Sequence, residues 1–112
     1  AYEANVLGTQ DLETGRSRSE AREFEAAEAA FEDAKAHFET ADEALADVAG
    51  NAPEDLEAPV EVAACRTTHF VQAATAFRDA AADAATGNLS AAKTHREEGE
   101  TQLQQAAGCG SN

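Results

Sequence analysis

The chain lacks several of the residue types that usually build a globular core. It contains no tryptophan, methionine or isoleucine, and its 112 residues include only five phenylalanines, one tyrosine and two prolines. Few large apolar side chains combined with a high net charge are typical of disordered chains. Abundant alanine, the strongest helix former, and the strict helical spacing of the phenylalanines argue against disorder. The sequence therefore predicts a folded helical protein with a small core and little stability to spare.

Basic residues are scarce as well. The chain has 8 lysines and arginines against 22 aspartates and glutamates, a formal charge of −14, and its only lysines are Lys35 and Lys93. Such a charge repels phosphate backbones and anionic headgroups, so neither nucleic acid nor a membrane surface is expected as a partner. No apolar run approaches the ~20 residues that cross a bilayer. The expected partners are a protein or a second copy of the chain, with cations diffusely associated with the acidic face.

Motifs for catalysis or for a resident metal are missing. There is no Gly-x-Ser-x-Gly elbow, no glycine-rich phosphate loop and no Cys-x-x-Cys-His haem site. His37, His69 and His95 each lack the glutamate three residues earlier that di-iron helical bundles use. The acidic runs contain no Asp-x-Asp-x-Asp-Gly calcium loop. We therefore expect no enzymatic activity and no cofactor.

The clearest helical pattern runs from Phe24 to Val48. Bulky and small apolar residues alternate there at spacings of three and four, in the order Phe24, Ala27, Phe31, Ala34, Phe38, Ala41, Leu45 and Val48. This pattern predicts an amphipathic helix that packs closely on a neighbour, and Gly50 is expected to end it.

Two further helices are predicted after a linker at residues 51–59, where Pro53 and Pro59 oppose a continuous helix. A short helical turn at residues 54–56 is compatible with this linker. The next helix runs from about Val60 to Thr86, with an apolar stripe of Ala63, Thr67, Phe70, Ala74, Phe77, Ala81 and Ala84.

Gly87 suits a left-handed cap at the end of that helix, and Asn88 can cap the start of the last one. The last helix is expected to reach about Ala107. Its inward stripe comprises Leu89, Ala92, Gly99, Leu103 and Ala106. Because Gly99 and Arg96 both lie on this stripe, we expect the last helix to pack less well than the others.

The N-terminal segment is harder to assign, because Gly8 and Gly15 lower its helical propensity. It is either a separate helix that turns near Ala21, which we favour, or an extension of the helix that follows. The expected fold is then one all-α domain over residues 1–112. It is a four-helix bundle built from two antiparallel hairpins, residues 1–50 and 60–107. The expected core is Phe24, Phe31, Phe38, Leu45, Phe70 and Phe77, interleaved with alanines.

Cys65 and Cys109 lie equally far from Gly87 along the sequence, one before it and one after it. An antiparallel hairpin with its tip at Gly87 brings them to the same level, so a disulfide is predicted. A disulfide would in turn favour an extracellular or cell-surface location over a cytoplasmic one. Two alternatives stay open: two free thiols, or a zinc site in which His69, one helical turn after Cys65, is a further ligand.

The segment Asn88-Leu89-Ser90 matches the acceptor pattern for N-glycosylation, at the accessible tip of the predicted hairpin. Glycosylation of Asn88 is predicted if the protein is secreted; otherwise Asn88 serves only as a helix cap. Ala1 in place of an initiator methionine suits a chain cut from a secreted precursor, and equally a trimmed one.

Part of the chain resembles tetratricopeptide helix pairs. Gly15, Ala27, Phe31 and Ala34 fall where that repeat carries glycine, alanine, an aromatic residue and alanine. In the later hairpin Gly87, Leu89 and Ala92 fit the pattern, whereas Arg96 and Gly99 depart from it. The resemblance implies helical hairpins that bind protein. It supports a cytoplasmic adaptor, in which an exposed alanine-rich groove binds a partner helix, as the alternative to an extracellular interaction or structural module.

The composition, rich in alanine, aspartate, glutamate and threonine but poor in lysine, resembles that of haloarchaeal proteins. An ordinary acidic protein from a mesophile is the alternative. Carboxylates at this density repel one another in dilute salt, whereas molar salt shortens the Debye length to about 3 Å. Kosmotropic salts also strengthen apolar burial.

We therefore predict that the chain folds cooperatively only at high salt. Circular dichroism of the purified protein should show little helix in dilute buffer, and a cooperative gain of helix as a kosmotropic salt is raised to molar concentration. Full helicity in dilute buffer would contradict this prediction and favour the mesophilic alternative.

Overall fold

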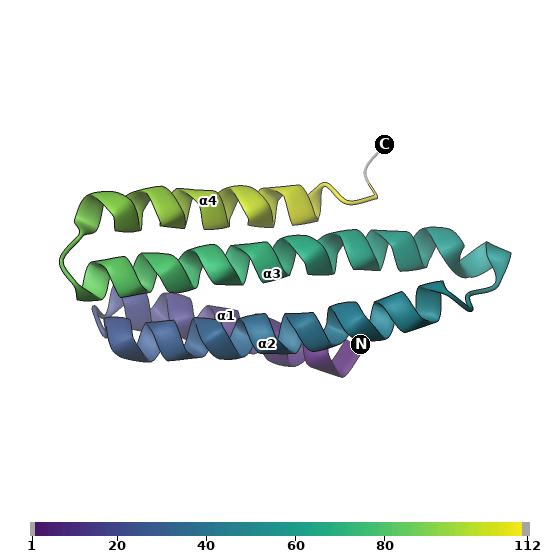
Figure 1. Cartoon of the computed structure of the whole chain (residues 1–112), viewed down its shortest axis with the longest axis horizontal. Coiled ribbons are helices and arrows are strands. Elements are labelled where there is room, and N and C mark those ends of the chain that lie inside the picture. Colours follow the sequence, from purple (N-terminus) through teal and green to yellow (C-terminus); the bar gives the residue numbers. More distant parts are fainter. Residues whose placement is uncertain (1, 111–112) are drawn as a thin grey trace.

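A computed structural model describes residues 2–110, and its regular structure is entirely helical. The helices are α1 (Tyr2–Glu20), α2 (Phe24–Ala49), α3 (Glu57–Ala85) and α4 (Leu89–Ala107), with a short 3-10 turn, η1 (Glu54–Leu56), just before α3. Consecutive helices run antiparallel, so the α1–α2 and α3–α4 turns lie at one end of the molecule and the α2–α3 linker lies at the other (Figure 1). The predicted all-α bundle is confirmed.

The two hairpin turns have the same backbone design. In each, an amide bonds the carbonyl five residues earlier: Glu23 N to Arg18 O at 2.8 Å, and Asn88 N to Asp83 O at 2.8 Å. The residue before the donor is left-handed, with φ 62° at Arg22 and φ 83° at Gly87. This arrangement is the Schellman motif, in which glycine usually takes the left-handed position. The separate first helix and the Gly87 cap are thus confirmed, while the left-handed arginine is a finding of the structure.

The linker is shorter than predicted because α3 begins at Glu57 and not near Val60. Pro59 therefore lies in the first turn of α3, where an amide hydrogen would have no partner within the helix. The helical turn at Glu54–Leu56 is present as expected.

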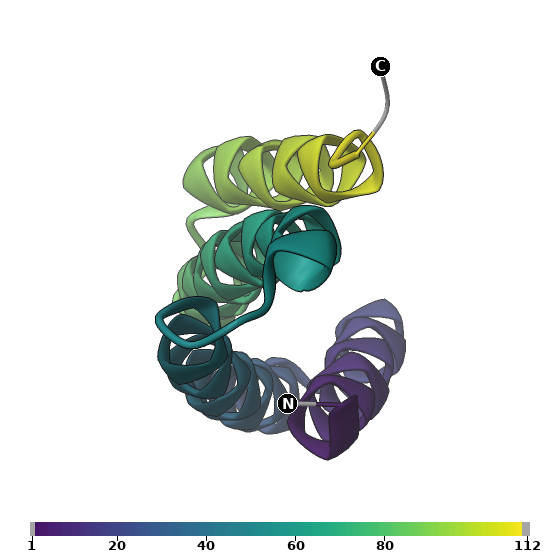
Figure 2. The ribbon, with the colours of Figure 1, turned by 90° about the vertical axis from the view of Figure 1, so that its right-hand side faces the viewer.

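The helices stack in chain order along a curved path. Helix α2 packs against α1 and α3, and α3 packs against α2 and α4. Among the described residues the backbones of α1 and α4 do not approach each other, and Figure 2 shows these two helices at the ends of the curve. The bundle is therefore open on the side between α1 and α4.

Phenylalanine rings pack directly onto glycines of neighbouring helices. A Cβ atom added at each of these glycines would lie 2.5–2.8 Å from the nearest ring atom, with the pairs being Gly8–Phe38, Gly15–Phe31 and Gly99–Phe77. Such distances are shorter than real side-chain contacts, so only glycine lets the helices approach this closely. The prediction that Gly99 loosens the packing of α4 is therefore wrong.

One row of these contacts crosses all four helices. The rings of Phe31 on α2 and Phe77 on α3 stack with their centroids 5.4 Å apart. Gly15 of α1 packs against the ring of Phe31, and Gly99 of α4 packs against the ring of Phe77. A second stack joins α2 to α3, between Phe38 and Phe70 at 5.1 Å. The core is thus a set of rings enclosed by glycine and alanine.

The burial of single residues differs from the sequence pattern at several positions, among them Val48 of the predicted α2 stripe, which is 48% exposed. Phe31, Phe38, Leu45 and Phe77 are buried as predicted, but Phe24 and Phe70 are only half-buried. Leu89, expected to face inward, is 67% exposed. Helix α3 buries Ala73 and Ala76 in addition to its predicted stripe, because it lies between α2 and α4 and contacts both.

The ring–glycine contacts yield a prediction for Gly15→Ala and Gly99→Ala. Each should lower the free energy of unfolding by about 1–3 kcal/mol through overpacking, although alanine exceeds glycine in helix propensity by about 1 kcal/mol. The matched control is Gly50→Ala. Gly50 has helical dihedral angles, and a Cβ there would lie no closer than 3.7 Å to the nearest atom. That control should be neutral or slightly stabilising. Urea unfolding of the three variants in the same salt would test this, and equal stabilities would contradict it.

A candidate binding groove and a disulfide at opposite ends of the bundle

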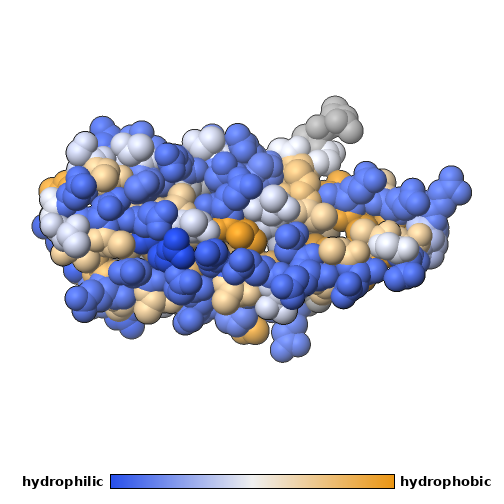
Figure 3. All heavy atoms as spheres, viewed as in Figure 1, coloured by the Kyte–Doolittle hydropathy of each residue, from blue (hydrophilic) through white to orange (hydrophobic). Residues whose placement is uncertain are grey.

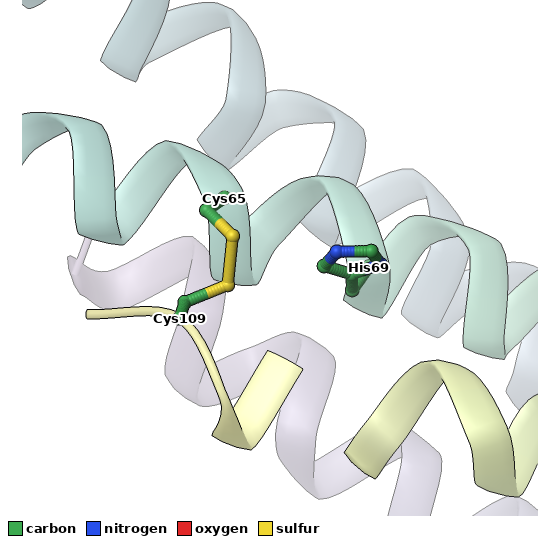
Figure 4. Close-up of side chains that lie close together, drawn as sticks. All are labelled: Cys65, His69 and Cys109. Atoms are coloured by element: carbon green, nitrogen blue, oxygen red, sulfur yellow. A yellow bond between two sulfur atoms is a disulfide. The ribbon is translucent and has the colours of Figure 1, made fainter. Parts of the chain in front are cut away.

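A disulfide joins Cys65 of α3 to Cys109, just after α4. The two cysteines are 44 positions apart in sequence, and their Cα atoms are 6.0 Å apart. Figure 4 shows the bond linking α3 to the segment that follows α4. The pairing predicted from the equal spacing around Gly87 is confirmed.

His69 lies one helical turn along α3 from Cys65, so the residues of the alternative zinc hypothesis do come together. One possible ligand atom from each of Cys65, His69 and Cys109 lies within 4.8 Å of the other two. Metal ions bind thiolates, however, and in the disulfide neither sulfur is a thiolate. His69 Nδ1 lies 2.7 Å from Gln102 Oε1 of α4. In this oxidised form the cluster serves to join two helices.

Each histidine links two adjacent helices. The bonded pairs are His37–Asp11 at 2.6 Å, His69–Gln102 at 2.7 Å and His95–Asp83 at 2.6 Å. The hydrogen bond to Asp83 raises the pKa of His95 above its ordinary value, with the nearby Glu98 and Asp79 charges adding to the effect. The three side chains thus have structural partners and lie outside the groove described below.

Asn88 caps α4 as predicted, its Oδ1 accepting a hydrogen bond from the Ala91 amide at 3.3 Å. The residue is exposed at the tip of the α3–α4 hairpin. The side-chain nitrogen, to which a glycan would be attached, takes no part in the capping bond. Glycosylation at Asn88 is compatible with this geometry and stays a prediction.

A groove of about 600 Å³ opens between α1 and α4, at the end of the molecule that carries the two hairpin turns. All four helices contribute to its lining. The apolar part of the lining consists of Phe24, Phe31, Phe77, Ala80, Ala81, Ala84, Leu89 and Ala92. The stacked rings of Phe31 and Phe77 therefore form both the core of the bundle and part of the groove.

The groove is rich in basic side chains. Four of the chain's 8 basic residues line it, namely Arg16, Arg22, Lys93 and Arg96, together with Glu20 and Glu100. The charge of the groove differs from that of the chain as a whole, which carries 22 acidic residues. Hydrophilic residues also dominate the face of the molecule seen in Figure 3. None of the described helices has the length and apolar character needed to cross a membrane.

Three of the four basic groups in the groove lack a carboxylate partner. Among the described residues, no acidic oxygen lies within 4.0 Å of the charged groups of Arg16, Arg22 or Arg96, and Lys93 Nζ is only at that limit from Glu97. The guanidinium of Arg16 lies over the ring of Phe77, 5.5 Å from its centroid.

Of the three arginines outside the groove, Arg18 and Arg78 are paired with carboxylates, whereas Arg66 has no ion pair among the described residues. Arg18 lies 2.7 Å from Glu23, and Arg78 lies 2.9 Å from Glu32 and 3.1 Å from Asp79. The hydrogen bonds to Glu32 and Asp79 raise the pKa of Arg78 further. The groove arginines are thus available to a ligand in a way that Arg18 and Arg78 are not.

An alanine-rich groove was expected only with the tetratricopeptide-like alternative, and its basic residues were not predicted from the sequence, although a signal for them exists. Arg16 precedes the first hairpin turn and Arg22 lies within it, and Lys93 and Arg96 follow the second turn. In an up-down-up-down bundle the first and last turns lie at the same end, so these four residues must gather there. Their gathering could have been expected from the topology, whereas the open side of the bundle could not.

The disulfide carries a prediction for stability. Replacing both cysteines, as Cys65→Ser with Cys109→Ser, should lower the free energy of unfolding by about 4 kcal/mol by the chain-entropy model for a loop of this length. Hydrogen exchange should accelerate first in α4. As a control, a thiol reagent should label the denatured chain only after reduction. Labelling without reductant, or equal stability of the double variant, would contradict the prediction.

Comparison with known proteins assigns no family to the chain. No protein-family model, curated protein or solved structure matches it. The resemblance to tetratricopeptide hairpins therefore stays a prediction. The function has to be inferred from the groove and the disulfide themselves.

Proposed function

We propose that the protein is a non-enzymatic interaction module that acts outside the cell or at the cell surface of a halophile, and that it binds a protein partner in the groove between α1 and α4. The observation that carries this proposal is the groove itself. Its apolar lining stays open because α1 and α4 do not meet. Concave surfaces of this kind, left by helices that pack only on their neighbours, are the binding surfaces of helical repeat proteins.

The polar residues of the groove favour binding over catalysis. They are arginines, a lysine, two glutamates and Ser19. A nucleophilic mechanism needs a serine or cysteine within hydrogen-bond reach of a base that is held in place by a third group. The described lining residues include no histidine or cysteine to act with Ser19. What they do offer is apolar area and charge, which are the means of recognition.

The disulfide supports the extracellular location. Disulfides form and persist in oxidising compartments and are rare in the cytosol. The exposed acceptor pattern at Asn88 is consistent with passage through a secretory route. The excess of acidic residues agrees with a working environment of high salt.

A cytoplasmic tetratricopeptide-like adaptor is the second candidate. It is favoured by the stacking of each helix mainly on its sequence neighbours. In this case the same groove would bind the partner, but the cysteines would be reduced. The two candidates thus differ in compartment and not in the surface they use.

Site-directed crosslinking in the native organism tests the binding surface. A photoreactive leucine analogue at position 89, in the groove, should form a covalent complex with one defined protein. The matched control is the same analogue at position 56, because Leu56 is also an exposed leucine (49% against 67%) but lies in η1 at the opposite end. Equal crosslinking from both positions, or none from position 89, would contradict the groove as the binding surface.

The intact mass of the native protein tests the compartment. A chain lighter than its reduced form by the mass of two hydrogens, with or without a glycan, supports the extracellular module. Two alkylatable thiols and an unmodified mass would contradict it and support the cytoplasmic adaptor.

A further inference from the structure

We propose that the ligand of the groove is a short, acidic, amphipathic segment of a partner protein. Its apolar side chains contact Phe24, Ala84 and Leu89, and its carboxylates bind Arg22, Lys93 and Arg96. This inference rests on the proposed function, because it specifies the partner of the same groove. It goes further because it assigns a negative charge to the ligand, whereas the overall charge of the protein would select a positive one.

The distribution of charge is the first argument. A chain with a formal charge of −14 attracts basic partners over most of its surface. In the groove, basic residues outnumber acidic ones by four to two, and three arginines have no carboxylate partner among the described residues. In a chain with 22 acidic residues, such partners would have been easy to supply. Guanidinium groups left without a partner can bind carboxylates of a ligand through paired hydrogen bonds.

The backbone of Arg22 is the second, independent argument. Its φ of 62° places it in the left-handed region, which is unfavourable for residues with a Cβ atom. The equivalent position of the other hairpin holds Gly87, which adopts the same conformation without this cost. Non-glycine residues held in such conformations cluster at binding sites. The arginine side chain, which lines the groove, is a reason for keeping a costly residue in this turn.

The apolar lining determines what kind of anion fits. Leu89 is 67% exposed, the most exposed of the large apolar residues, and it lines the groove beside the alanines of α3. An inorganic polyanion has no apolar group that could cover this surface. The volume of about 600 Å³ is in the range of pockets for small ligands, so it accommodates a few side chains and not a whole helix.

Even where salt screens charges over distance, the acidic residues around the groove disfavour direct contact with an extended polyanion or with a second copy of this chain. Nucleic acid carries its charge along its whole length, so the parts that extend beyond the groove would meet an acidic surface. A second copy of this chain would bring its own charge of −14. A partner protein can concentrate its carboxylates in one segment and be neutral or basic elsewhere. The observations therefore favour a heterologous partner with a local acidic segment.

Selection from a random peptide library on the disulfide-bonded protein tests the inference directly. The selection is run at a salt concentration at which circular dichroism shows the protein folded. We expect enrichment of peptides that combine aspartate or glutamate with leucine or phenylalanine. Enrichment of basic peptides, or of none, would overturn the proposal.

Two charge-matched double variants then locate the effect. Lys93→Gln with Arg96→Gln removes two positive charges from the groove. The control, Lys35→Gln with Arg66→Gln, removes two positive charges from outside it. We expect the groove variant to weaken binding of a selected acidic peptide roughly tenfold, and the control to change it by less than about twofold. Equal losses in both variants would show a response to overall charge and would overturn the proposal.

A single substitution separates binding from folding. Arg22→Gly should raise the thermal midpoint of unfolding, because glycine relieves the left-handed conformation, and yet it should weaken binding of the acidic peptide. A variant that is more stable but binds less well cannot have lost binding through misfolding. Unchanged affinity of Arg22→Gly would remove Arg22 from the site and overturn that part of the proposal.

Leu89→Ser distinguishes failure of this inference from failure of the proposed function. If Leu89→Ser weakens binding of selected peptides of any charge while the groove double variant has no effect, the groove is a binding surface but its acidic selectivity is wrong. If neither variant affects binding, the groove is not the site and both proposals fail. Inorganic polyphosphate serves as the anion probe: binding of polyphosphate that is insensitive to Leu89→Ser would assign an anion site in place of a peptide groove.

Discussion

The close contact between phenylalanine rings and glycines determines most of this structure. The chain has few large apolar side chains, so it cannot fill a wide space between helices. It instead brings the helix backbones close together, with Gly15 and Gly99 facing the rings of Phe31 and Phe77. The stack of Phe31 on Phe77 connects these two contacts into one row through α1, α2, α3 and α4. Five phenylalanines are enough for a bundle of this size because the neighbours of their rings are so small.

The scarcity of large apolar residues also leaves the bundle open between α1 and α4. Helices α2 and α3 supply all five phenylalanines. Each of these two helices has a neighbouring helix on both sides, α1 and α3 for α2, and α2 and α4 for α3. Apart from Tyr2, one valine and four leucines, α1 and α4 consist of small and polar residues, and Leu12 and Leu103 already pack in the core, so neither helix has a second apolar stripe broad enough to bind the other and close the bundle. Their opposed surfaces become the walls of the groove, and the edges of the stacked rings become part of its floor. The open side therefore follows from the composition of the outer helices.

Patterns within one helix could be predicted from the sequence, and contacts between helices largely could not. The alternation from Phe24 to Val48 identified α2 and, except at its two ends, its buried face, and the symmetry of Cys65 and Cys109 around Gly87 identified the disulfide. A glycine in a helix, however, can have two opposite effects: its low helix propensity weakens the helix, or its missing side chain leaves room for a ring of a neighbouring helix to pack closely. The sequence alone favours the first, and Gly99 exemplifies the second. The outward position of Leu89 and the gathering of Arg16, Arg22, Lys93 and Arg96 likewise depend on how the hairpins are arranged in space.

The disulfide and the groove lie at opposite ends of α4, and α4 connects their roles. The buried residues of this helix are small (Ala92, Gly99 and Ala106) and Leu103 packs beside them against the core, so the close fit of Gly99 on Phe77 covers little apolar area. The bonds His95–Asp83 and His69–Gln102 add polar attachments along its length, and the disulfide fixes its far end. Helix α4 is also the wall of the groove that presents Lys93 and Arg96. A wall that frayed or tilted would move these charges relative to Arg16 and Arg22 on the opposite side. The covalent bond at one end of the bundle thus preserves the spacing of charges at the other end, which is a reason for an otherwise small helix to carry it.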